Sequence, residues 1–142
     1  KSSADIYIFN KSVKFKDGKI YSSKRNFFLR YIRRGFYGYY GESLPQENIV
    51  FKKSLFDAID KNLLSKFKLA GDWFIFKELF SQTKNIKNIN KKFAIFVYCD
   101  GQLSSNKDAY LSEIKDAANF KESFMLRIFF NIEKYLGRIW SI

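Results

Sequence analysis

The strongest structural signal in the sequence is an aromatic run that begins directly after a glycine and an aspartate. Asp72 leads into apolar residues at helical spacing, from Trp73 to Phe80. Gly71 allows a tight backbone turn, and the carboxylate of Asp72 can accept hydrogen bonds from the free N–H groups at the start of a helix. The pattern predicts an amphipathic helix that begins at Asp72 and ends near Gln82.

Two roles are open for Asp72 at this point. An aspartate at the start of a helix is most often a structural cap. A carboxylate held beside aromatic side chains at the mouth of a pocket can instead act as a catalytic base. The helical pattern alone favours the structural role, so the remaining sequence has to decide.

Alternating and turn-forming residues predict a sheet before this helix. Residues 5–9 are β-rich and predict a short strand. Polar and apolar residues alternate in residues 12–15 and 19–21, on either side of Asp17-Gly18. The Asp-Gly pair is a strong turn signal, so the stretch predicts a β-hairpin. After the aromatic helix, residues 92–98 form a nearly continuous apolar run, which predicts a strand buried on both faces.

Other stretches predict further elements around this sheet. Helical patterns occupy residues 26–34, 51–59 and 107–118, and a short strand is expected at residues 86–89. Residues 62–68 are expected to be a connector. Alternation of strands and helices predicts an α/β protein.

Composition excludes several classes of chemistry. The chain of 142 residues contains no histidine and only one cysteine, so imidazole catalysis, histidine metal sites and internal disulfides are excluded. Lysine and arginine exceed aspartate and glutamate by 26 to 14, which gives a net charge of +12. Such a charge favours a partner that carries phosphates. No apolar run is long enough for a membrane-spanning helix.

Three blocks of sequence occur in the order and at the spacing of a known family. They are Pro-Gln-Glu followed by Phe and two lysines in residues 44–55, Ala-Gly-Asp-Trp in residues 70–76, and Gly-Gln-Leu-Ser in residues 101–106 with Tyr110 and Glu113 after it. Together they resemble the C-terminal half of bacterial family 2 glycosyltransferases of the GT-A fold, which build capsular polysaccharide and lipopolysaccharide. The resemblance covers most of residues 4–115 and implies a partial GT-A-type mixed sheet flanked by helices.

The resemblance implies that Asp72 is the general base. The matching acid takes a proton from the acceptor hydroxyl as its oxygen attacks the anomeric carbon of a nucleotide-sugar, with inversion. The implied substrate-binding residues are Gln46 and Glu47 on the acceptor side, Trp73 next to the base, and Gln102, Ser104 and Ser105 near the diphosphate.

The family's metal site lies outside this sequence. Its Asp-x-Asp belongs to the N-terminal nucleotide-binding half, and the chain begins at Lys1 without that half. The resemblance thus implies that residues 1–119 are the acceptor-side half and do not turn over nucleotide-sugar alone. We expect no cofactor in this chain and Mg²⁺ or Mn²⁺ in the full-length enzyme. The chain also departs from the family at residues 97–99, where relatives often carry arginine or histidine.

The expected partners are a nucleotide-sugar donor and a glycan or lipid-linked acceptor. Residues 120–142 predict a basic amphipathic helix, which could lie on an anionic membrane or pack against protein. We expect a cytoplasmic protein with peripheral contact at the inner face of the membrane. The alternative is a non-catalytic basic module that binds nucleic acid or an anionic membrane through residues 30–34 and the C-terminal helix. We favour the glycosyltransferase and do not expect nucleic acid as a partner.

Overall fold

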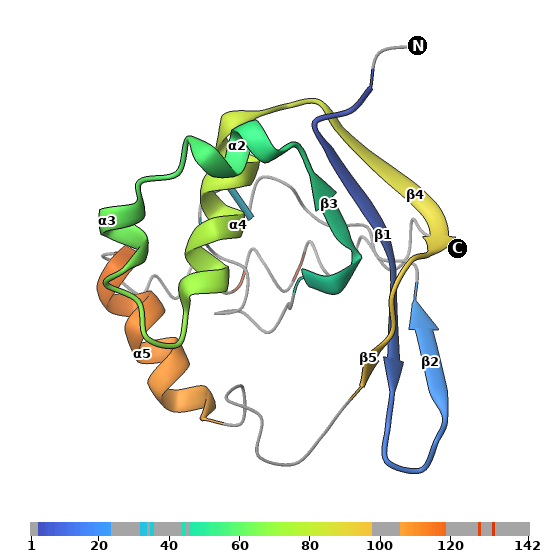
Figure 1. Cartoon of the computed structure of the whole chain (residues 1–142). Helices are drawn as coiled ribbons and strands as arrows, with labels where there is room; N and C mark the ends of the chain where they lie inside the picture. The colour runs from blue at the N-terminus through green and yellow to red at the C-terminus, as the bar shows by residue number, and fades with distance from the viewer. Residues whose placement is uncertain are drawn as a thin grey trace.

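The long strand β1 (Ile6–Lys14) is the element on which the sheet is built. The computed structural model describes residues 3–23, 32–33, 35, 44, 46–97, 106–118, 128 and 132. Within these residues the chain is an α/β protein with a mixed sheet of five strands, all of the others pairing with β1. The described helices lie to one side of this sheet (Figure 1). The expected α/β class is therefore confirmed.

Buried and more exposed side chains alternate along β1, and the buried ones mark the face of the sheet that meets the helices. Ile6, Ile8 and Ser12 are buried, and the residues between them are more exposed. The separate strands expected at residues 5–9 and 12–15 are one continuous strand, because the same alternation runs through both.

The predicted hairpin is confirmed. β1 turns at Asp17-Gly18 into β2 (Ile20–Ser23), and the two strands pair antiparallel. Gly18 has a φ of 80°, a left-handed conformation that glycine adopts without steric cost. The carboxylate of Asp17 accepts from the backbone N–H of Lys19 at 3.0 Å and closes the turn.

Three further strands complete the sheet along β1. A short 3-10 helix η1 (Gln46–Asn48) leads into β3 (Ile49–Phe51), which pairs antiparallel with the first half of β1. β4 (Ile86–Lys92) pairs parallel with that same half, and β5 (Phe96–Val97) pairs parallel with the second half.

The expectation of a long buried strand at residues 92–98 is wrong. Within the described part of this stretch, Lys92 is the last residue of β4, only Phe96 and Val97 form a further strand, and Phe93, Ile95 and Val97 are exposed. The pairing with β1 shifts register after Phe9, so residues 93–95 lie between two short ladders. An apolar run predicts burial only where another layer covers both faces of the sheet.

Four helices whose bounds are described follow the strands or connect them. They are α2 (Lys53–Asp57), α3 (Lys61–Leu64), α4 (Gly71–Gln82) and α5 (Lys107–Ala118). α4 and α5 confirm the predicted helices. The helix expected at residues 51–59 is shorter, because Phe51 belongs to β3, and the expected connector at 62–68 contains part of α3.

The helices expected at residues 26–34 and 120–136 fall largely outside the described residues. Within those stretches the structure describes Ile32, Arg33, Ile128 and Ile132, and all four are helical.

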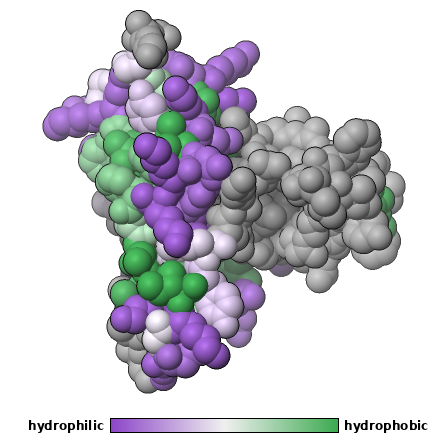
Figure 2. Space-filling model, turned by 90° about the vertical axis from the view of Figure 1, so that its right-hand side faces the viewer, coloured by the Kyte–Doolittle hydropathy of each residue, from purple (hydrophilic) through white to green (hydrophobic). Residues whose placement is uncertain are grey.

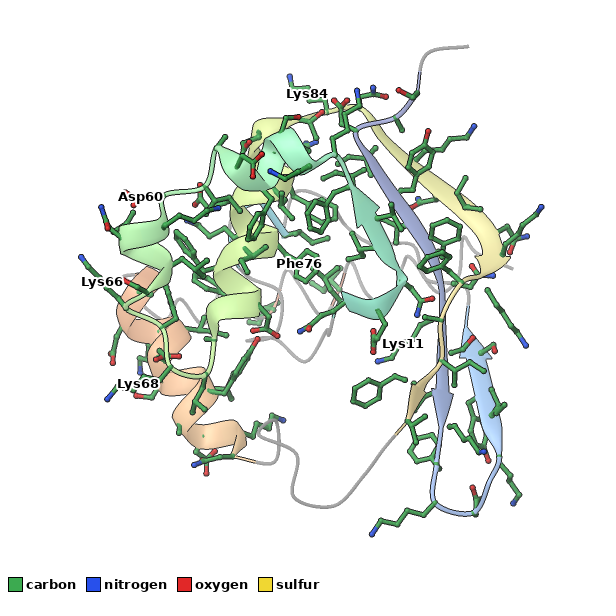
Figure 3. All side chains as sticks on the ribbon, in the orientation of Figure 1. Lys11, Asp60, Lys66, Lys68, Phe76 and Lys84 are labelled. Carbon is green, nitrogen blue, oxygen red and sulfur yellow. The ribbon has the colours of Figure 1, made fainter. Side chains whose placement is uncertain are left out.

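The core lies between α4 and the covered face of the sheet. Trp73, Leu79 and Phe80 of α4 are fully or almost fully buried, as are Ile6 of β1 and Ile114 of α5. Phe76 also extends from α4 on the side of β3 (Figure 3) and belongs to the same core cluster as Ile49. Burial of these large side chains supplies the main driving force for the fold.

Candidate functional site

The start of α4 is built differently from the prediction. Gly71 is the first helical residue, Ala70 occupies the capping position, and no side chain caps the helix there. Gly71 does not have a positive φ, and a Cβ at this position would meet Leu64 at an ordinary distance of 3.6 Å. The expected tight turn at Gly71 is therefore wrong. Asp72 lies in the first turn, where its Oδ1 accepts from the backbone N–H of Trp73 at 2.7 Å.

Among the described residues, Gln46 and Tyr110 come from distant segments and donate to the carboxylate of Asp72. The amide Nε2 of Gln46 donates to Oδ2, and the hydroxyl of Tyr110 donates to Oδ1 at 3.2 Å. Burial raises the pKa of Tyr110, and the nearby charge of Asp72 raises it further. The phenol thus keeps its proton and remains a donor. The fold brings together one side chain from η1, one from α4 and one from α5.

Glu113 holds the segment that leads into α4. Its carboxylate accepts from the backbone N–H groups of Lys68, Leu69 and Ala70 at 2.7, 2.8 and 2.6 Å. Burial raises the pKa of Glu113, but the three backbone donors and the charge of Lys68 outweigh burial and leave that pKa below its ordinary value. This carboxylate fixes the backbone just before Asp72.

Tyr110 and Glu113 were not among the predicted site residues. They are three residues apart on α5, so both side chains lie on the face of the helix that meets the start of α4. Their helical spacing after the third sequence block was the available signal. Their partners, however, are more than 35 residues away in sequence, which no local pattern reveals.

The two residues after Gln46 carry buried polar atoms with no hydrogen-bond partner among the described residues. These atoms are Oε2 of Glu47 and Nδ2 of Asn48. The other side-chain polar atom of Asn48, Oδ1, accepts from the backbone N–H of Ala94 at 2.8 Å, which fixes η1 against the segment between β4 and β5. A buried oxygen without a donor costs free energy, so the position of Glu47 depends on the packing of the segments around η1.

Trp73 lies in the core rather than on the surface of the site. Its side chain is 1% exposed, and its indole N–H donates to the backbone oxygen of Gly35 at 2.9 Å. Gly35 has a φ of 74°, and a Cβ there would come within 2.7 Å of the indole ring. This burial favours a packing role for Trp73, so we leave it out of the proposed site.

The predicted diphosphate-binding residues Gln102, Ser104 and Ser105 lie outside the described residues. In the described part of the chain, no three aspartate, glutamate, histidine or cysteine side chains gather closely enough to hold a metal ion. Among the described helices, none has the length and apolar character needed to cross a membrane.

One member of the predicted basic cluster at residues 30–34 has a structural role. Arg33 donates through Nε to the backbone oxygen of Phe80 at 2.9 Å and through Nη2 to that of Thr83 at 3.0 Å. These bonds satisfy carbonyl groups at the C-terminal end of α4, where a cation is also favoured by the helix dipole. Arg33 therefore fixes the helix end.

Comparisons with known proteins provide no family for this chain. No family model, no curated protein and no solved structure matches it. A function has to be inferred from the side chains around Asp72.

Proposed function

We propose that this chain is the acceptor-side part of an inverting glycosyltransferase with a GT-A-type fold, and that Asp72 is its general base. The observation that supports the proposal is the pair of donors on one carboxylate. Gln46 and Tyr110 come from two different elements and both donate to Asp72. A carboxylate that served only the start of α4 would need neither donor.

In the proposed reaction, the acceptor hydroxyl lies against Asp72. Its proton moves to the carboxylate while its oxygen forms a bond to the anomeric carbon of the donor sugar. The bond between that carbon and the diphosphate oxygen breaks, and the nucleoside diphosphate leaves with the electron pair. Mg²⁺ or Mn²⁺ bound in the other half would neutralise the leaving group in the complete enzyme.

Three side chains would position the reactants. Gln46 and Tyr110 fix the orientation of the Asp72 carboxylate, because each donates to a different oxygen. Glu47, the neighbour of Gln46 on η1, would contribute to the acceptor side.

The coding sequence upstream of Lys1 tests whether the required second half exists. We expect an open frame that encodes a β-α-β nucleotide-binding half with an Asp-x-Asp. A start codon close to Lys1, with no such half encoded separately, contradicts the proposal.

Substitution of Asp72 in the full-length enzyme tests the base. Asp72→Asn should lower kcat about 10²- to 10⁴-fold with little change in acceptor KM, since it removes the proton acceptor and keeps the shape. Tyr110→Phe should lower kcat about tenfold, because it removes one hydrogen bond to a charged group. Asp116→Asn, on the exposed side of α5, is the matched control and should have no effect. Unchanged turnover in Asp72→Asn rules out the base assignment.

A further inference from the structure

The end of the sheet away from the helices carries bulky apolar side chains in contact with solvent. Figure 2 shows hydrophobic surface between hydrophilic surfaces in the lower part of the molecule, where Figure 1 places the hairpin and β5. The exposed residues are Phe15, Ile20, Tyr21, Phe93, Ile95 and Val97, and their exposed fractions run from 44 to 60%. We call this surface the hairpin-end patch. Groups of exposed large apolar residues commonly mark interaction sites.

The strand register places apolar residues on both faces of this sheet end. Ile20 and Val97 are the partners of Lys14, one on each side, and so share its face. Tyr21 and Phe96 are the partners of Val13 and share the opposite face. Because a flat partner would cover only one of these faces, the arrangement suits insertion of the sheet end into a surrounding apolar medium.

Lysines surround the hairpin-end patch. Residues 10–23 and 90–97 contain six lysines and a single acidic residue, Asp17, which gives a local charge of +5. Lys14, Lys19 and Lys92 are exposed, and Lys19 forms a 3.5 Å ion pair with Asp17, whose side chain is also exposed. Lysine side chains can reach phosphate groups while nearby apolar side chains enter the acyl region.

We propose that the hairpin-end patch docks on an anionic lipid membrane, with the tip of the β1–β2 hairpin at the depth of the headgroups. Three of the exposed residues are the aliphatic side chains of Ile20, Ile95 and Val97, which gain from hydrocarbon but offer no stacking surface to nucleic-acid bases. Docking of a second copy through the same patch would place two surfaces of local charge +5 against each other, and their repulsion disfavours such a dimer. This proposal does not rest on the glycosyltransferase assignment.

Sedimentation of the 142-residue chain with lipid vesicles tests the proposal. Vesicles of phosphatidylcholine with roughly a quarter phosphatidylglycerol should bind the chain about tenfold more tightly than phosphatidylcholine alone. F15S/I20S/Y21S should weaken that binding by about tenfold or more, because it removes apolar surface at the tip. V50S/L63S is the matched control, since both residues are exposed outside the patch, and it should bind as the unchanged chain does.

A charge variant gives an independent measurement on the same surface. K14Q/K19Q should weaken binding about fivefold for each lysine and reduce its dependence on salt. Circular dichroism should show that each variant keeps the fold, because all substituted side chains are exposed.

Three outcomes would overturn the proposal. One is that F15S/I20S/Y21S binds vesicles as tightly as the unchanged chain, which would place the contact elsewhere, for example in residues 120–142. Another is binding to oligothymidylate with no binding to anionic vesicles. The third is a concentration-dependent dimer in sedimentation velocity that F15S/I20S/Y21S abolishes.

Discussion

The two halves of β1 have different surroundings. In the first half, Ile6 and Ile8 are buried beneath the helices, and the residue just before Ile6 is held by a long-range bond, in which Thr83 Oγ1 donates to Asp5 Oδ2 at 2.7 Å. In the second half, Tyr21 and Val97 on the neighbouring strands are exposed, and described helices do not cover them (Figure 1). Apolar side chains of the sheet thus stabilise the fold in the first half of β1, whereas those beside the second half are exposed to solvent.

The largest expected difference between the halves is the cost of removing a phenylalanine. Phe80 is fully buried in α4, whereas Phe93 is 60% exposed and stacks on Phe9 with ring centroids 4.8 Å apart. Phe80→Ala should lower the free energy of unfolding by about 3–5 kcal/mol, because it leaves a cavity. Phe93→Ala should cost less than about 1 kcal/mol, the value of one exposed ring contact. Urea denaturation measures the free energy of unfolding of both variants. Equal decreases would contradict the difference in burial between the two regions.

Among the described residues, Gly18 and Gly35 have a positive φ and provide a second matched pair. Gly35→Ala should lower the free energy of unfolding by about 3 kcal/mol, since a Cβ would lie 2.7 Å from the Trp73 ring in addition to the backbone strain. Gly18→Ala should cost about 1 kcal/mol, because the same backbone strain arises at the hairpin with nothing within 4 Å of the new Cβ. Thermal melts can compare them. If Gly18→Ala proved the more harmful, the close packing at Gly35 would be refuted.

The smallest expected effect is a pH dependence that belongs to the helical side. The pKa of Glu113 in the folded state lies below its ordinary value of 4.5. Its contribution to stability is therefore present above about that pH and is lost as pH falls through the folded-state pKa. Glu113→Gln should cost about 1 kcal/mol at neutral pH, because solvent screens a partly exposed carboxylate.

Urea denaturation at neutral and acidic pH measures this dependence. Glu113→Gln should lose less further stability than the unchanged chain on acidification. Asp116→Asn on the same helix is the control and should follow the unchanged chain. Identical acid profiles for all three proteins would show that the bonds from Lys68, Leu69 and Ala70 contribute nothing to acid sensitivity.

Local patterns identified elements whose signals are contained in one short segment. The Asp17-Gly18 turn needs only a left-handed glycine between two alternating runs, and the structure has that turn. α5 spans Lys107–Ala118 as its periodicity predicts. The run at residues 92–98 misled because apolar composition does not show whether another layer covers the strand.

The candidate site could be predicted only in part. The sequence predicts Gln46 and Asp72 as site residues, and the fold places them in contact. Tyr110 follows the third sequence block, but its hydrogen bond to Asp72 joins α5 to α4 across 38 residues. Trp73 is of a residue type that often contacts ligands, but the structure buries it in the core. Exposure of an aromatic side chain depends on what packs over it, which the side chain itself does not determine.

By itself, the sequence determined the α/β class, the hairpin and the two long described helices, because periodicity and turn chemistry act within a few residues. Only the tertiary structure decided that Gln46 and Tyr110 meet at Asp72, that Glu113 holds the backbone before α4, and that one end of the sheet keeps its apolar side chains in solvent. Each of these depends on contacts between segments far apart in the chain, and such contacts are set by the packing of the whole fold.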